Sequence, residues 1–418
     1  MNLQDKSVLV VDRGLFVSFA EALVGKFGKV GYFSYWESSF GDGRELVIGM
    51  GLEGIERVKY FEKDYRNYDL LVFPDVYDGW MVKDLRDHGF RVWGSGLGAE
   101  LETLRWKTKQ RFKDLGLPVN ESHRVRGVNE LTSFLKENER EGGWYIKVSI
   151  LRGLGETWHA LNYAQAKGFI DDFESKNGAI AHIIHFIVEA PIPDADEVGY
   201  DGYCVDGQFP EQSMYGWEVK DKAYLGMVSP YDSLPEPVRK VNDALSSVFQ
   251  ELQYRNFLST ELRDEFCIDA SCRHASPAGE VLASNMTNLD EVIWEGAEGR
   301  LVNPEFESKY GAQIILSSEW AREHWQVVEF PEEIRKWVKL YNHCRIDDGT
   351  GLHDYVVPQF IPHFDQMKEI GPVVALADDP QEAVDLCKER AEQVSGFKVT
   401  CEADALDEAL EELTSNSA

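Results

Sequence analysis

The sequence is poor in three features that mark common classes of protein. Its six cysteines stand apart without a CxxC pair, which argues against a disulfide framework or a zinc site and favours reduced thiols. It contains no apolar segment of about 18 residues, so we expect no membrane partner. Its first residues lack the apolar run of a signal peptide. These absences predict a soluble protein of the cytoplasm.

Positive charge is also scarce. The chain has 43 Lys and Arg residues against 73 Asp and Glu residues, which gives a formal net charge of −30 at pH 7. A protein this acidic repels the phosphates of nucleic acids, although one basic cleft remains compatible with the total charge. We therefore expect small-molecule partners and no nucleic acid.

The first pattern along the chain is an alternation of strand and helix signals. The length of 418 residues predicts roughly two to four domains. Uninterrupted apolar runs at 7–12 (SVLVVD) and 69–74 (DLLVFP) are typical of strands buried on both faces of a parallel sheet, and helical patterns lie between them. About the first hundred residues are therefore expected to form an open α/β sheet.

The segment 257–277 (FLSTELRDEFCIDASCRHASP) predicts two short strands joined by a tight turn. If the strands pair, Glu261 and Asp269 lie on neighbouring strands and can share a face. Two carboxylates brought together favour a cation between them, and oxygen ligands suit Mg²⁺. Ser271 adds a hydroxyl oxygen and Arg273 a phosphate-binding fork. The alternative is an acidic surface hairpin with solvated charges.

Basic residues and a glycine loop precede this hairpin. Residues 100–115 predict one basic amphipathic helix, which includes Arg105, and residues 144–148 predict a strand with Lys147 facing inward. The loop that follows holds Gly153 and Gly155, which let backbone N–H groups approach a phosphate. The alternative for this loop is an ordinary hairpin turn.

The rest of the chain contributes a hinge, a second basic spot and a C-terminal α/β segment. Residues 179–189 predict an apolar strand that ends at Glu189, where a proline-containing hinge begins, and Lys220 and Lys222 lie further on. Residues 371–377 predict a buried strand. The acidic tail, 402–418, is expected to be a solvated helix or a frayed end.

Taken in order, these features resemble the ATP-grasp superfamily, and within it most closely the phosphoribosylamine–glycine ligases. The most specific match is residues 268–277 (IDASCRHASP), which are similar to the metal-binding segment of that family. The resemblance implies an α/β and α+β architecture with three parts: an open α/β domain at 1–99, a two-lobed nucleotide-binding core at 100–290 with its small lobe at about 118–190, and a C-terminal segment at 291–418 that contains a small α/β domain.

The resemblance also implies roles for individual residues. ATP and Mg²⁺, with Mn²⁺ as an alternative metal, are the implied cofactors. The implied metal ligands are Glu261, Asp269 and Ser271. The implied ATP contacts are Arg105, Lys147, Gly153, Gly155, Glu189, Ala190, Ile192, Glu197 and Lys220. The implied catalytic residues are Arg273 and Lys222.

The reaction that the resemblance implies is ATP-dependent joining of a small carboxylate to a small amine through an acyl phosphate, by a monomer or homodimer. One departure from the glycine ligases is visible. Their long Gly-, Asp-, Thr- and Asn-rich loop is missing, because the chain runs directly from Tyr224 through Met227 to Ser229. Two alternatives stay open: a nucleotide-binding relative without ligase activity, such as a scaffold or sensor, and a purely structural interaction protein.

Overall fold

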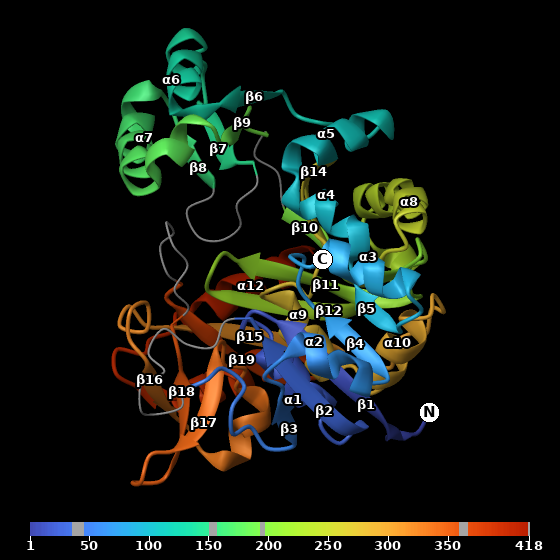
Figure 1. The fold of residues 1–418 in the computed structure, drawn as a ribbon. Helices are drawn as coiled ribbons and strands as arrows, with labels where there is room; N and C mark the ends of the chain where they lie inside the picture. The colour runs from blue at the N-terminus through green and yellow to red at the C-terminus, as the bar shows by residue number, and fades with distance from the viewer. Residues whose placement is uncertain (36–45, 150–156, 193–196, 359–366, 417–418) are drawn as a thin grey trace.

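The computed structural model describes residues 1–35, 46–149, 157–192, 197–358 and 367–416, whose strands form three sheets (Figure 1). No helix in these ranges is both long enough and apolar enough to cross a membrane. The predicted mixed α/β architecture is confirmed.

The N-terminal strands form a parallel arrangement in the order β5-β4-β1-β2-β3. Residues Val8, Leu9, Val10 and Val11 of β1 are almost completely buried, as expected for a strand covered on both faces. The strands are β1 (Leu3–Asp12), β2 (Phe27–Ser34), β3 (Ile55–Arg57), β4 (Leu70–Phe73) and β5 (Val92–Gly94). The helical segments around them are α1 (Val17–Leu23), α2 (Phe61–Asp64), η1 (Tyr65–Asn67), α3 (Gly79–Asp87) and η2 (Gly96–Ala99).

This sheet does not end at β5. Arg255 of β13 pairs with Gly94 of β5, and the sheet continues through β10, β11, β12, β15 and β19, with β14 paired to β13. These strands are β10 (Glu197–Val205), β11 (Gln212–Val219), β12 (Ala223–Pro230), β13 (Arg255–Arg263), β14 (Phe266–Ser271), β15 (Tyr310–Ser317) and β19 (Glu369–Ala377). The helices packed with them are α8 (Glu236–Glu251), α9 (Ala278–Asn285), α10 (Leu289–Gly296) and α11 (Pro380–Glu392), and η4 (Tyr231–Ser233) follows β12. One sheet therefore joins early, middle and late parts of the chain.

A smaller lobe stands apart from this sheet at the top of Figure 1. Its four strands run in the order β6-β9-β7-β8, and its apolar residues form a core of their own. Its elements are β6 (Ser122–Arg126), α6 (Gly127–Glu137), β7 (Trp144–Val148), β8 (Thr157–Ala160), α7 (Tyr163–Asn177), η3 (Gly178–His182) and β9 (His185–Glu189). The strand predicted over 179–189 is thus shorter, because only its last five residues find partners on β6 and β7.

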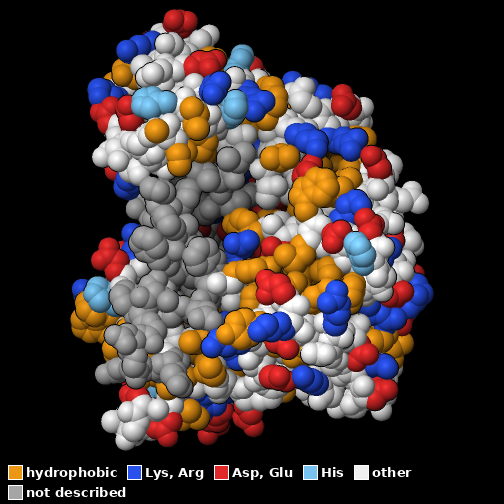
Figure 2. Space-filling model, in the orientation of Figure 1, with side chains coloured by type: hydrophobic (Ala, Val, Ile, Leu, Met, Phe, Trp, Pro, Cys, Tyr) orange, Lys and Arg blue, Asp and Glu red, His pale blue; other side chains and the backbone are white. Residues whose placement is uncertain are grey.

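The segment between the two sheets also differs from its prediction. Residues 100–115 form two helices, α4 (Glu100–Thr103) and α5 (Arg105–Asp114), because Leu104 adopts a non-helical backbone with φ −117° and ψ 61°. The break separates two sets of contacts: α4 packs against β14, whereas α5 reaches the small lobe. Figure 2 shows Lys and Arg side chains gathered over α5.

The C-terminal part carries the third sheet and a final helix. The sheet order is β17-β18-β16-β20, from β16 (Gln326–Glu329), β17 (His343–Asp347), β18 (Leu352–Val356) and β20 (Ser395–Gly396), with η5 (Glu332–Trp337) beside it. The tail forms a helix, α12 (Ala405–Asn416), as one of the two predicted alternatives, but one of its faces is packed instead of solvated. Ala405, Leu406, Ala409 and Leu413 share one helical face and are buried in the core formed with β11, β12 and β15.

Candidate functional site

The acidic hairpin pairs as the sequence predicts. Strands β13 and β14 are antiparallel, and Glu261 lies directly opposite Asp269, with Ser259 opposite Ser271. Asp264 has a φ of 52° at the turn, a left-handed conformation that Asp tolerates better than most residues. Because side chains alternate along a strand, Glu261, Asp269 and Ser271 project from one face of the hairpin.

Arg105 connects this hairpin to the small lobe. Its Nη2 lies 3.9 Å from Asp269 Oδ2, and its Nη1 donates a hydrogen bond of 3.2 Å to the carbonyl oxygen of Val148, the last residue of β7. The structure therefore brings together two residues, Arg105 and Asp269, that are far apart in sequence and were predicted to share a site. Arg105 thus contacts both the hairpin and the last residue of β7 in the small lobe.

The donor set at the hairpin has the chemistry that a hard divalent cation prefers. It consists of two facing carboxylates and a hydroxyl, so every donor is oxygen. In the part of the chain that the structure describes, no group of three or more His, Cys, Asp or Glu residues is arranged to hold a metal ion. A pair of carboxylates fits a Mg²⁺ ion whose remaining ligands are phosphate oxygens and water, and does not fit a metal that the protein holds alone.

A second charged cluster lies where the small lobe meets α5. Glu189, at the end of β9, has one oxygen 2.8 Å from Lys109 Nζ and the other 3.3 Å from Lys147 Nζ. The Glu189 side chain is only 5% exposed. Although burial acts to raise it, the two ammonium groups hold the pKa of Glu189 below its usual value. Burial lowers the pKa of Lys109, against the opposing effect of Glu189.

Asn120 extends this cluster to the hinge. Lys109 Nζ donates to Asn120 Oδ1 at 2.9 Å, and Asn120 Nδ2 donates to the carbonyl oxygen of Ala190 at 2.9 Å. The backbone N–H of Ala190 donates to Glu121. Both backbone groups of Ala190 thus have partners within the protein, while Ile192 is half-buried. Contact of these hinge residues with adenine stays a prediction.

Sequence reasoning did not assign a role to Lys109, which lies within the basic helix predicted over residues 100–115. The usable signal was spacing, because positions four apart on a helix share a face and Arg105 lies four residues earlier.

Sequence reasoning missed Glu102 entirely. Glu102 Oε1 accepts a hydrogen bond of 2.9 Å from Arg273 Nε, and Glu102 has no exposed side-chain surface. A glutamate at a helix start is ordinary in sequence, so only the contact reveals it.

The remaining predicted residues lie elsewhere or outside the described ranges. Lys220 and Lys222 occupy the turn between β11 and β12, where Lys222 Nζ lies 2.7 Å from Glu402 Oε2 and Glu402 raises the pKa of Lys222. Lys222 lines a cavity of about 300 Å³ whose lining includes neither Arg273 nor Asp269. The catalytic role of Lys222 stays a prediction.

Glu197 begins β10 and pairs with Arg263 in the sheet register. Gly153 and Gly155 lie outside the described residues.

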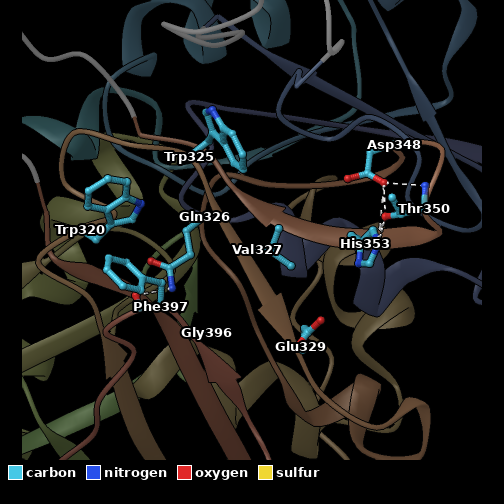
Figure 3. Close-up of a pocket in the computed structure, with 10 residues that line it drawn as sticks. All are labelled: Trp320, Trp325, Gln326, Val327, Glu329, Asp348, Thr350, His353, Gly396 and Phe397. Atoms are coloured by element: carbon cyan, nitrogen blue, oxygen red, sulfur yellow. Dashed lines mark hydrogen bonds and ion pairs between the residues drawn. The ribbon is translucent and has the colours of Figure 1, made fainter.

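A larger cavity of about 720 Å³ lies in the C-terminal part, and none of the predicted site residues lines it. Figure 3 shows Trp320 and Phe397 on one side of it and Asp348 and His353 on the other, with Val327 between. It is therefore separate from the cluster of lysines and carboxylates.

Comparison with solved structures gives consistent matches over nearly the whole chain. Phosphoribosylamine–glycine ligase from Thermotoga maritima aligns with a TM-score of 0.69 at 15% identity, covering 95% of this chain and 99% of that one. The biotin carboxylase domain of Hydrogenobacter thermophilus 2-oxoglutarate carboxylase, in complex with MgADP and bicarbonate, aligns at 0.64 and 12%, covering 96% and 92%. N5-carboxyaminoimidazole synthetase from Staphylococcus aureus, complexed with ADP, aligns at 0.60 and 10%, covering 92% and 96%.

No protein-family model matches the sequence, and no curated protein matches it significantly. At identities of 10–15% the structural matches establish the fold alone. They agree with the resemblance drawn from the motifs. The chain has the fold of the ATP-grasp enzymes.

Proposed function

We propose that the protein is an ATP- and Mg²⁺-dependent ligase that joins a small carboxylate to a small amine. The observation that carries the proposal is the pairing of Glu261 with Asp269 beside Arg105 of α5, together with Lys147 on the small lobe and Lys109 on α5. The fold supports it, since two of the three structures described above hold ADP, one of them with magnesium.

The residues divide into two groups by charge. Glu261, Asp269 and Ser271 would hold Mg²⁺, which neutralises charge on the phosphates, and ATP would supply the phosphoryl group that activates the carboxylate. On the cationic side, Lys147 and Arg105 would bind phosphate oxygens, and Lys109 would hold Glu189 in place at the hinge. Arg273 would orient the transferred group.

Glycine and phosphoribosylamine are not proposed as the specific substrates. Residues Ala223–Pro230, where the glycine ligases carry their long loop, form strand β12, which is paired on both sides with β11 and β15. The reaction class is thus proposed without these two compounds. A cytoplasmic location, the absence of nucleic-acid partners, Mn²⁺ as a substitute metal and a monomeric or homodimeric state remain predictions.

The test is formation of ADP from ATP with a panel of amino acids and other small carboxylates, using hydroxylamine as the amine. We expect ADP and a hydroxamate to appear together, only with Mg²⁺ and only with some carboxylates. Hydroxylamine is suitable because it captures activated carboxyl groups whatever the natural amine is. ATP binding without ADP formation for any carboxylate of the panel would contradict the ligase and favour a scaffold or sensor.

A further inference from the structure

A buried glutamate anchors the segment that carries Arg273. Glu102, on α4, has no exposed side-chain surface. Its Oε1 accepts from Arg273 Nε at 2.9 Å, and its Oε2 accepts from the backbone N–H of Cys272 at 2.6 Å. A carboxylate without solvent is costly unless both oxygens have donors. Both donors come from neighbouring residues, so the carboxylate fixes one short stretch of chain.

The same stretch is held from its other sides by buried polar groups. The carbonyl oxygen of Cys272 accepts from Ser95 Oγ, which in turn accepts from Asn256 Nδ2 at 2.9 Å. The backbone N–H of His274 donates to the carbonyl oxygen of Pro74 at 2.9 Å. Ser95 and Asn256 are buried, so the backbone on both sides of Arg273 is restrained by groups that water does not reach.

Glu102 holds Arg273 through its Nε atom, which determines how the rest of the guanidinium is presented. Glu102 engages Nε, on the inner side of the guanidinium, and the Arg273 side chain is 22% exposed. Among the described residues, none accepts a hydrogen bond from Arg273 Nη1 or Nη2. An arginine fixed through Nε offers both Nη groups in parallel, which matches two oxygens of a phosphate or carboxylate.

The position of Glu102 also relates Arg273 to the carboxylate pair. Arg105, three residues after Glu102, lies beside Asp269, whereas Glu102 holds Cys272 and Arg273. The break at Leu104 lets two neighbouring helices contact both ends of the stretch from Asp269 to Arg273. These contacts therefore fix the separation between Asp269, the proposed metal ligand, and Arg273.

We infer that Glu102 is a positioning residue, which holds the Arg273 guanidinium with both Nη groups directed at the reacting phosphoryl or acyl oxygens. The inference rests on the proposed function for what Arg273 binds, and on the contacts above for how Arg273 is held. Glu102 would act through Arg273 and through the backbone of Cys272.

The first test is a double-mutant cycle in the ligase assay. We expect Glu102→Gln to lower kcat about 100-fold, the cost of misplacing a group by about an ångström, with the KM for ATP little changed. Arg273→Ala should lower kcat at least as much, and adding Glu102→Gln to it should cause no further loss. The matched control is Glu100→Gln, because Glu100 lies on the same helix and pairs with Lys107 at the surface. A full loss from Glu102→Gln in the Arg273→Ala background would overturn the inference.

The second test does not depend on activity. In wild-type protein, the Nε–H signal of Arg273 in a ¹H–¹⁵N spectrum should exchange slowly with water, because its acceptor is fully buried. Arg273→Lys assigns the signal. Fast exchange in wild type would refute the anchoring, whatever the enzyme assay shows. Slow exchange without any ATP turnover would instead refute the proposed function and leave the anchoring intact.

Discussion

Lys147 Nζ lies 3.3 Å from Glu189 Oε2, which joins the lysine predicted to bind phosphate to the glutamate predicted to lie at the adenine hinge. Glu189 also pairs with Lys109, so Lys147 is not its only cation. Lys147 is the more exposed of the two lysines, at 16% against 9%. This difference in exposure leads to two contrasting predictions: loss of Lys147 should affect nucleotide turnover, and loss of Lys109 should affect stability.

Lys147→Ala should abolish function and spare the fold. ATP turnover should fall by several orders of magnitude, because the variant loses a phosphate-binding charge in a shielded site, while Lys109 still neutralises Glu189. Steady-state ADP formation and circular dichroism measure the two effects. Lys167→Ala, which removes a surface lysine paired with Asp171 on α7, is the control. Normal turnover in Lys147→Ala would rule out its assignment.

Lys109→Ala should instead destabilise the protein. It removes the donor to Asn120 and the nearer cation to buried Glu189, so we expect a loss of about 2–3 kcal/mol in the free energy of unfolding. Urea denaturation checks this value, with Lys147→Ala measured in parallel. Equal losses for the two variants would contradict the asymmetry described above.

The carboxylate pair should make nucleotide binding depend on magnesium. ATP should raise the melting temperature of wild-type protein more with Mg²⁺ than with EDTA, since a ligand that binds only the folded state stabilises it. Asp269→Ala should lose this difference, and ATP turnover with it, while remaining folded. Asp264→Asn, at the exposed turn of the same hairpin, should retain both. A magnesium effect that survives in Asp269→Ala would exclude Asp269 as a ligand.

Asp12 should give stability a pH dependence. Burial raises the pKa of Asp12 to about 6 from 3.8, although Tyr32 and the backbone N–H groups of Gly14 and Phe16 donate to it and act to lower the pKa. The folded state therefore binds the proton more tightly than the unfolded state. The resulting stabilisation is complete below a pH of about 4 and is lost as the pH rises through about 6.

Asp12→Asn removes this titration. Relative to wild type, the variant should gain roughly 2–3 kcal/mol in the free energy of unfolding between pH 4 and pH 7, whatever its absolute stability. Chemical denaturation of both proteins at the two pH values measures the difference. A gap between the two proteins that stays constant with pH would contradict the raised pKa.

The C-terminal helix should be part of the folded core. Leu406→Ala should cost about 2–5 kcal/mol, the usual range for a fully buried leucine, because Leu406 packs in the core shared with β11, β12 and β15. Glu411→Ala, on the exposed face of the same helix, should change stability little. Thermal denaturation compares the two variants, and equal melting temperatures would mean that the helix is not packed.

The parts of the fold that the sequence predicts are those with a local signal. Strand β1 is an uninterrupted apolar run because both of its faces are covered, and the β13–β14 hairpin has apolar positions on each side of a charged turn. Glu261 and Asp269 could therefore be paired from sequence alone. The acidic composition of α12 hid its buried face, since charge dominates any average over that segment.

The parts that escaped prediction depend on contacts between distant residues. Glu102 reads as an ordinary helix-start glutamate until Arg273, 171 positions later, is found against it. The β5–β13 junction rests on a single residue pair, Gly94 and Arg255, which no periodicity could reveal. Leu104 has no glycine or proline beside it to signal its break.

The separate sheet of the small lobe has a practical consequence for handling this protein. Its core residues, from Val125 to Ala190, all come from within the lobe, so a recombinant fragment of residues 118–190 should fold when expressed by itself. The large sheet offers no such boundary, because it contains neighbouring strands, β5 and β13, that lie far apart in the chain. Limited proteolysis at both ends of the lobe should therefore release it intact, whereas separating β5 from β13 would leave each strand with an unpaired edge.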